Sequence, residues 1–378
     1  KCNDIRISLL ILKYEFMTKA VLIIGTALLG LAITIGILGV RHFSPNKDRI
    51  VNFIKENPDK AALTLIRNDE IIANKNAERL QPLASTVKII IAIEYAEQAA
   101  KGTIDPDALI SLKELETYYA PNTDGGAHPA WLNYAKQDIV DYKISIRNIV
   151  KGMILFSSNA NTEWLQHKLG LDTINKRVEL LGIQQHSEIY YLVSSLFVGK
   201  EAFPQLKSKA LQTALKDMPI KDYIATTELV HKKLITDTLY RTDFGDLSMP
   251  IQKIWSDNLP ASTTQEYANL MQKFNSKTYF SSKVQMLLDE AMEGLMKSPG
   301  NQANLKHAGT KGGSTSFVLT KAFYATDKKG NKTEFALFLN DLTPIETQQL
   351  TGSLNDFIVN VLYDEAFVAT IANTLKDD

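Results

Sequence analysis

Cysteine is almost absent from this sequence, and the single Cys2 excludes internal disulfides and any zinc site built from cysteine ligands. Histidine is scarce too, and none of the six histidines has the spacing that places two imidazoles on one helix face. We therefore predict neither a metal nor another cofactor. An excess of one charge is also lacking, because 42 basic residues balance 42 acidic ones and no basic block stands out. Without a surface that neutralises phosphates, nucleic acid is excluded as a partner.

One segment near the beginning is a long hydrophobic run. Residues 20–40 contain no charged side chain and are long enough to cross a hydrocarbon layer of about 30 Å as a helix. We predict a membrane anchor here, after a short leader at residues 1–19 in which Met17 is the natural start. The alternatives are a cleaved signal peptide, which would make the protein secreted, and a buried core helix. An anchor would place the rest of the chain outside the cytoplasm, in the bacterial periplasm or on the cell surface.

The remaining sequence has the composition of a globular protein, with 45% hydrophobic and 22% charged residues over the whole 378-residue chain. A linker over residues 41–49 leads into one domain over residues 50–378. Strand-like patterns occupy both ends of this domain, at residues 61–67, 70–73, 316–326 and 333–340. Helical patterns fill the middle, with extra helices around residues 200–300, and a last helix spans residues 344–363. The pattern predicts an α+β fold, in which the terminal strands form one antiparallel sheet packed against a mostly helical middle.

A serine and a lysine open a helix that is apolar nearly all round. Ser85 and Lys88 are three residues apart, a spacing that puts both side chains on one face of a helix. A serine hydroxyl becomes nucleophilic when a base takes its proton, and a lysine amine kept neutral by burial can be that base. The positive end of the helix dipole would favour an oxyanion at the same place. By itself, however, a serine cap beside a solvated lysine is the simpler interpretation.

Two further polar groups lie near the ends of predicted elements. Ser157 and Asn159 follow an apolar helix at residues 144–155, from which they could face a cleft. Lys311 opens a Lys-Gly-Gly-Ser stretch at the start of a predicted strand, where glycines such as Gly313 would let a substrate backbone approach closely. A polar helix end and a glycine-rich turn are the simpler interpretations of these groups taken singly.

Taken in order, the three groups resemble the Ser-x-x-Lys, Ser-Asp-Asn and Lys-Thr-Gly motifs of class A beta-lactamases and penicillin-binding proteins. The resemblance covers residues 50–363 and implies a serine hydrolase with an acyl-enzyme on Ser85, whose proton passes to Lys88. It also implies that Ser157 relays a proton to the leaving nitrogen, supported by Lys311, and that the amides of Ser85 and Ser314 form the oxyanion hole. The substrate-binding residues that it implies are Asn159, Gly313, Ser314 and Thr315.

The sequence departs from these motifs in two places that concern substrate and turnover. Gly312 replaces the hydroxyl residue of the third motif, a gap that Ser314 or Thr315 could fill. The glutamate with a following Leu-Asn that activates water in class A enzymes is missing, and Glu188 is the candidate in that region. We predict a small-molecule or peptide substrate, either a beta-lactam or a cell-wall peptide, the latter implying a D,D-peptidase. A membrane-tethered sensor of the same fold without turnover is the third hypothesis.

Overall fold

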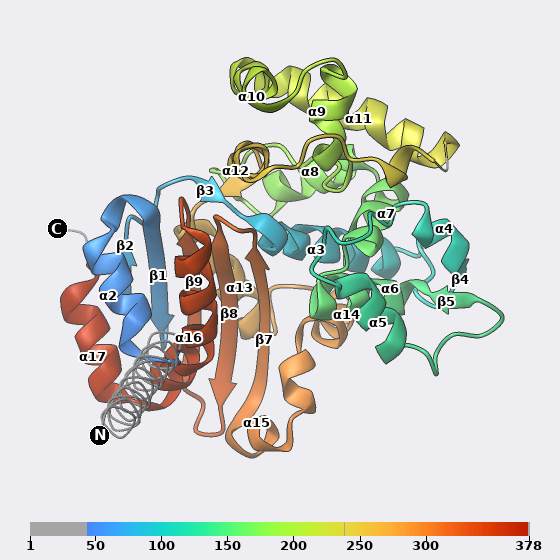
Figure 1. Cartoon of the computed structure of the whole chain (residues 1–378). Coiled ribbons are helices and arrows are strands. Elements are labelled where there is room, and N and C mark those ends of the chain that lie inside the picture. The colour runs from blue at the N-terminus through green and yellow to red at the C-terminus, as the bar shows by residue number, and fades with distance from the viewer. Residues whose placement is uncertain (1–43, 238, 377–378) are drawn as a thin grey trace, which may run out of the picture.

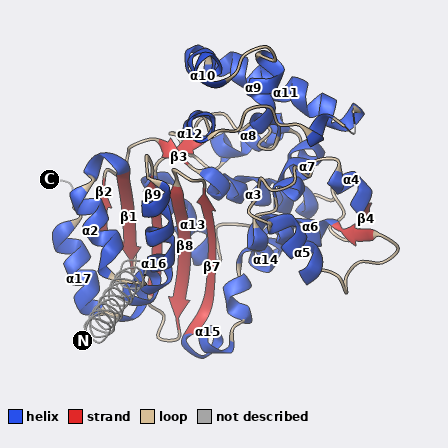
Figure 2. Ribbon diagram, viewed as in Figure 1, coloured by secondary structure: helices blue, strands red, loops and turns tan. Residues whose placement is uncertain are grey.

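A five-stranded antiparallel sheet lies beside a large helical region in the computed structural model, which describes residues 44–237 and 239–376 (Figures 1 and 2). The strand order is β2-β1-β9-β8-β7. An N-terminal hairpin of β1 (Ala61–Arg67) and β2 (Glu70–Lys75) pairs through β1 with β9 (Lys332–Leu339). β8 (Leu319–Asp327) and β7 (Leu305–Ser314) complete the sheet. Strands from both ends of the chain therefore share one sheet, which confirms the predicted α+β fold.

Helices cover both faces of this sheet. One face carries α2 (Asp48–Glu56), α16 (Pro344–Tyr363) and α17 (Glu365–Thr374). The other face carries α13 (Thr264–Ser276). On β9, Phe335 and Leu337 join the first core, whereas Ala336 and Phe338 join the second. Successive side chains on a strand point to opposite faces, so a strand that is covered on both sides is apolar throughout its length.

The helical region is built around α3 (Lys88–Ala100), which is buried along most of its length. Two short strand pairs border the region, β3 (Gln81–Pro82) with β6 (Ala261–Ser262) and β4 (Leu109–Ser111) with β5 (Lys143–Ser145). The other helices are α4 (Leu112–Glu116), α5 (Ala127–Tyr134), α6 (Ile146–Lys151), α7 (Asn159–Leu169), α8 (Leu171–Leu180), α9 (Val198–Ala202), α10 (Ser208–Asp217), α11 (Ile220–Thr236), α12 (Met249–Asp257), α14 (Ser282–Met292) and α15 (Pro299–Asn304). Of these, α9, α10 and α11 stand apart from the sheet at the top of Figure 1.

One strand was placed wrongly by the sequence pattern. The Lys-Gly-Gly-Ser stretch was expected to begin a strand, but it ends β7, a strand of 10 residues that begins at Leu305. Thr310 is the one β-branched residue in this strand, which contains no Phe, Tyr or Trp and three glycines, so the usual strand signal is weak. Its pairing with β8 over nearly its whole length decides its conformation. The terminal helix α17 was also not predicted.

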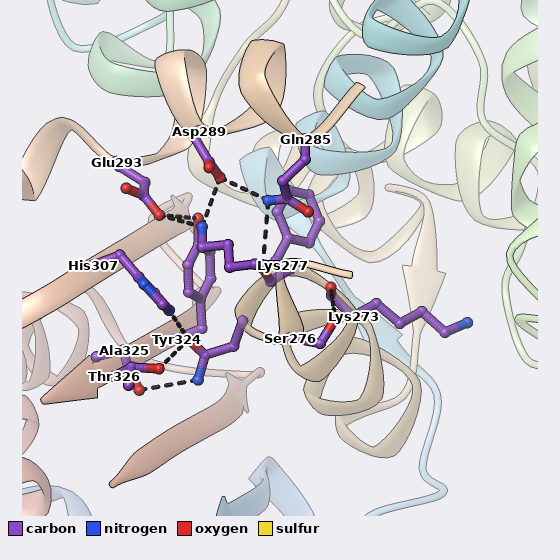
Figure 3. A network of polar contacts seen from close by, with 12 residues as sticks. Lys273, Ser276, Lys277, Gln285, Asp289, Glu293, His307, Tyr324, Ala325 and Thr326 are labelled. Carbon is purple, nitrogen blue, oxygen red and sulfur yellow. Dashed lines mark hydrogen bonds and ion pairs between the residues drawn. The ribbon is translucent and has the colours of Figure 1, made fainter. Parts of the chain in front are cut away.

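A polar network holds β7 and β8 to the helices on the inner face of the sheet (Figure 3). Lys277, at the end of α13, donates to Asp289 at 2.7 Å and to Glu293 at 2.5 Å, and the Tyr324 hydroxyl of β8 donates to the same Glu293 carboxylate. His307 of β7 also contacts the side-chain oxygen of Asn275 in α13 at 2.8 Å. Buried polar groups that are paired in this way fix the position of β7 relative to the helical region.

The predicted anchor at residues 20–40 and the leader before it lie outside the described residues. None of the helices that the structure does describe has both the length and the apolar character to span a bilayer. The predicted linker at residues 41–49 is only partly described, and α2 begins within it, at Asp48. In the described part of the chain, no group of three histidine, cysteine or acidic side chains is placed to hold a metal ion.

Candidate active site

The first motif lies where a tight turn passes into the central helix. Ser85 belongs to a 3₁₀ turn over Ala84–Val87, and α3 continues it from Lys88. Ala84 has a φ of 44°, which is uncommon for a residue with a side chain. Such backbone strain is typical of functional sites, where the surrounding structure holds it in place. Ser85 is half-buried and lines a cleft, whereas Lys88 is fully buried and is not among the lining residues.

The Lys88 amine is held by acceptors of the second motif. Its Nζ lies 2.7 Å from the carbonyl oxygen of Ser157, 2.8 Å from Oδ1 of Asn159 and 3.3 Å from Oγ of Ser157. Burial lowers the pKa of Lys88 to about 7, an effect that the Asp124 carboxylate partly opposes. A neutral amine donates two protons, so it can satisfy the two obligate acceptors and keep its lone pair free. The amine is therefore suited to accept a proton.

The second motif follows a turn of π-helix over Gly152–Phe156, which extends α6. Ser157 ends this turn with a φ of 70°, so a second strained residue lies in the site. Ser158 points the other way and is buried: its hydroxyl accepts from the Asn161 amide as the cap of α7 and contacts His128 Nδ1 at 2.9 Å. Ser157 and Asn159 therefore belong to the site, whereas Ser158 caps the start of helix α7.

A second lysine reaches Ser157 from the sheet. Lys311 Nζ donates to Ser157 Oγ at 3.1 Å and to the Gly312 carbonyl at 2.6 Å. The Ser157 hydroxyl thus lies between two amines. Burial and the nearby charges of Lys88 and Lys321 hold the pKa of Lys311 well below its ordinary value. A hydroxyl between two such amines can pass a proton from one side to the other.

Gly313 is required at its position, for a reason that differs from the expected one. A Cβ there would overlap the Ser85 amide nitrogen and lie 2.8 Å from the Leu83 carbonyl oxygen and from Thr320 Oγ1. The close approach that glycine permits is therefore made by the turn that carries Ser85, and not by a substrate backbone. This contact brings the end of β7, including Ser314, next to the Ser85 amide. The two backbones are thus placed together as an oxyanion hole requires.

Sequence reasoning missed Lys321, a third lysine near the site. It pairs with Gly312 across β7 and β8, and a Cβ on Gly312 would lie 3.7 Å from the Lys321 amine. Its side chain thus lies beside Gly312, the position at which the resemblance implies a hydroxyl residue. Burial lowers the pKa of Lys321 to about 8. A lysine inside the apolar run of β8 was the signal that could have identified it.

These groups surround a cleft of about 590 Å³. Of the residues predicted from sequence, Ser85, Ser157, Asn159, Gly313, Ser314 and Thr315 all line it. The Thr315 hydroxyl is engaged by Ser256 at 2.8 Å and by two amides of its own loop, whereas Ser314 is exposed. The lining also includes Thr123, Asp124, Gly125, Phe156, Leu192, Gln252, Trp255, Leu259, Lys321 and Leu354.

The structure does not bring Glu188 to this cleft. Its side chain is exposed, and it is not among the lining residues. The segment after α8 instead contributes Leu192 to the lining. The nearby Glu163 of α7 is fully buried, and its carboxylate accepts from the amides of Val193 and Ser194, the Ser194 hydroxyl and His231. Its oxygens are occupied, so Glu163 is placed to hold the segment that carries Leu192.

The additional helix α11 takes part in the same network. His231 of α11 donates its Nδ1 proton toward Glu163 at 3.0 Å and stacks on Tyr191, with 3.6 Å between ring centroids. On its other face it stacks on Tyr118, at 5.3 Å. Tyr118 belongs to the chain that leads to Thr123 and Asp124 in the cleft. One histidine of α11 thus joins two segments that form the walls of the site.

A match to a family model identifies the family to which these motifs belong. The model of the beta-lactamase enzyme family matches residues 45–309, which contain the first two motifs. The chain belongs to the beta-lactamase enzyme family. It is therefore a serine hydrolase that resembles class A beta-lactamases. No curated protein sequence matches the chain.

Solved structures of beta-lactamases share this fold. The beta-lactamase from Sphaerobacter thermophilus is 16% identical and aligns over 84% of this chain and 97% of its own, with a TM-score of 0.52. The TLA-3 extended-spectrum beta-lactamase is 15% identical over 83% of this chain and 98% of its own, with a TM-score of 0.50. The chromosome-encoded beta-lactamase of Vibrio parahaemolyticus is 10% identical over 85% of this chain and 100% of its own, also at 0.50. At these identities the likeness establishes the beta-lactamase-like fold alone.

Proposed function

We propose that this beta-lactamase family member is acylated by beta-lactams at Ser85, with Lys88 as the base, and releases the acyl group slowly. The observation that carries the proposal is the position of the Lys88 amine. Burial lowers its pKa to about 7, which leaves about half of the amine neutral near pH 7. In that form its two N–H groups serve the acceptors at 2.7 and 2.8 Å and its lone pair stays free. Such an amine can accept the Ser85 proton as the hydroxyl attacks the ring carbonyl.

The later steps of acylation follow from the groups around Ser157. As the amide bond breaks, the Ser157 hydroxyl donates its proton to the leaving nitrogen and is reprotonated from one of the two neighbouring amines. The amides of Ser85 and Ser314 stabilise the oxyanion. Asn159 holds the substrate amide, while Gly313, Ser314 and Thr315 form the wall along which the substrate lies. We propose that Lys321, with Lys311, attracts the substrate carboxylate in place of the hydroxyl that Gly312 lacks.

Slow release follows from the cleft wall that faces the acyl group. Activation of water needs a base within hydrogen-bond reach of it. In the described part of the chain, the segment after α8 contributes Leu192 to the cleft and no carboxylate. The acyl-enzyme would then persist unless Lys88 or Asp124, which also lines the cleft, activates water. The same observation favours a second candidate function, that of a D,D-peptidase acting on cell-wall peptides.

One experiment tests both candidates. The full chain and its Ser85→Ala variant are treated with a fluorescent penicillin, and the mass of the intact protein is followed over time. The proposal expects an adduct that forms on the wild-type chain, decays slowly and is absent from the variant. Rapid turnover without adduct would contradict slow release, and the absence of both adduct and hydrolysis would overturn the beta-lactam assignment. Release of D-alanine from a peptide ending in D-alanyl-D-alanine would support the peptidase.

We also propose that the enzyme acts outside the cytoplasm, tethered through residues 20–40. The support is the uncharged run of those residues, which is long enough to span a bilayer. Fractionation of cells that express the full chain tests this. Recovery with the membranes and access to added protease from outside are expected, whereas recovery in the cytosol would contradict it.

A further inference from the structure

The cleft carries opposite charges on two walls that belong to different parts of the fold. Lys321 lines the cleft from the sheet, on β8, and Lys311 of β7 lies buried against Ser157. Asp124 comes from the helical region, in the loop between α4 and α5. It is the one lining residue with a carboxylate among those the structure describes. A cleft with a cationic wall and an anionic wall is complementary to a ligand that carries both charges.

The Asp124 carboxylate is held in a fixed orientation. Its Oδ1 accepts from the Gly126 amide at 3.1 Å and its Oδ2 from the His128 amide at 3.0 Å. In the part of the chain that the structure describes, no lysine or arginine forms an ion pair with it. Each oxygen still has a lone-pair direction that is free for another donor. The side chain is half-buried, so water screens it less than a surface carboxylate.

The charge also acts inside the site. The field of Asp124 reaches the buried Lys88 amine and the ring of His128, where it favours the protonated forms. Because the Asp124 charge favours the protonated forms of these two groups, it would attract a protonated group of a ligand in the same way.

We infer that Asp124 is a specificity-determining residue that favours acyl donors with a protonated amino group on the acyl side. This inference rests on the proposed acylation of Ser85. A substrate whose carboxylate lies toward Lys311 and Lys321 extends its acyl half away from the sheet. The lining residues that remain for that half come mostly from the helical region and include the 123–125 segment and Leu192. An ammonium group there meets the Asp124 carboxylate, whereas an uncharged side chain gains nothing from it.

Two penicillins that differ by one amino group test this inference. Ampicillin carries the amino group on its acyl side chain, and benzylpenicillin has the same ring system without it. At pH 7 an α-amino group is mostly protonated. The measured quantity is the ratio of the second-order acylation rates of the two penicillins, for the full chain and for its Asp124→Asn variant. We expect this ratio to fall about fivefold in the variant, as for one partly screened ion pair.

The ratio of the two acylation rates separates the effect of Asp124 on the ammonium group from the other consequences of Asp124→Asn. Removing the Asp124 charge also lowers the pKa of Lys88, but this changes both acylation rates by the same factor. Lys321→Met serves as the matched control, because losing a carboxylate partner slows both penicillins and leaves their ratio unchanged. Raising the salt concentration should shrink the wild-type ratio and leave that of the Asp124→Asn variant unchanged.

Three results overturn the inference in different ways. Equal ratios in wild type and Asp124→Asn, with both penicillins still acylating the chain, contradict the role of Asp124 in specificity but not the acylation of Ser85. Normal acylation with deacylation abolished in the variant assigns Asp124 to water activation instead. A wild-type chain that neither penicillin acylates overturns the proposed function together with the inference.

Discussion

The buried Lys88 amine makes the pH dependence of acylation the sharpest test of the site. Only the neutral amine can take the Ser85 proton, and burial lowers the pKa of Lys88 to about 7. The acylation rate should therefore rise as pH increases through 7 and reach a plateau above about pH 8. With a pKa of about 7, the neutral fraction is about 0.09 at pH 6 and about 0.9 at pH 8, a tenfold increase.

An amine with the ordinary lysine pKa would behave differently over the same range. Its neutral fraction would rise about a hundredfold from pH 6 to pH 8 and would continue to rise toward pH 10. The two cases therefore differ in both the size of the change and the presence of a plateau. Since Ser157 links Lys88 with Lys311, the inflection in the profile belongs to the coupled pair of amines.

The assay is the second-order acylation rate of the full chain with a fluorescent penicillin, measured by stopped flow between pH 5.5 and about pH 9.5. Ser85→Ala gives the background at each pH. Lys321→Met removes a charge that lowers the pKa of Lys311, so its inflection should move to higher pH. A rate that stays constant from pH 6 to pH 8, or one that keeps rising without a plateau, would refute Lys88 as the neutral base.

Three further substitutions test the architecture of the site. Ser157→Ala should slow acylation by about 10²–10⁴-fold through loss of proton transfer. Ser158→Ala should instead lower the free energy of unfolding by about 1 kcal/mol through loss of a helix cap, and its acylation rate should stay within severalfold of the wild-type rate. The reverse pattern would contradict the assignment of Ser157 to the site and Ser158 to the helix cap. Gly313→Ala should abolish measurable acylation and destabilise the fold by about 1–3 kcal/mol, because a Cβ meets the backbone of the Ser85 turn. Gly352→Ala is its control, since nothing lies within 4 Å of a Cβ there, and an active Gly313→Ala variant would refute the close contact. Glu163→Gln should lower the unfolding free energy in urea by about 2–4 kcal/mol, because a buried carboxylate with several donors is lost. Glu188→Gln, at an exposed position, should change neither stability nor deacylation, and a slowed deacylation would restore Glu188 as a base.

Much of the sheet could be predicted because its strands carry local signals. β1 was predicted with its observed bounds, and the turn at Asn68 and Asp69 has the two positive φ angles typical of a two-residue hairpin. The helix α16 also has its predicted bounds, and it begins with a capping box formed by Thr343 and Glu346. In these segments the local signals and the final fold agree.

The site was only partly predictable for the opposite reason. Ser85, Lys88, Ser157 and Lys311 were found by their residue types and order along the chain. Lys321 and Asp124 were missed, because a lysine in a strand and an aspartate in a loop are common and gain meaning only from their neighbours in space. The loop before α5 is rich in turn residues, but whether such a loop borders the cleft depends on packing. Tyr118 and Trp131 are buried in the core, whereas Phe156 and Trp255 line the cleft.

The sequence by itself determined the fold class and indicated Ser85 as the candidate nucleophile, because hydrophobic periodicity, turn residues and motif order are properties of neighbouring positions along the chain. Tertiary structure decided which groups work together. Burial makes Lys88 suitable as a base, and the contact at Gly313 brings the end of β7 to Ser85. The network around Glu163 and His231 holds the segment after α8, which contributes Leu192 and no carboxylate to the cleft. These properties depend on desolvation and on distances between residues far apart in the chain, which no pattern of neighbouring residues contains.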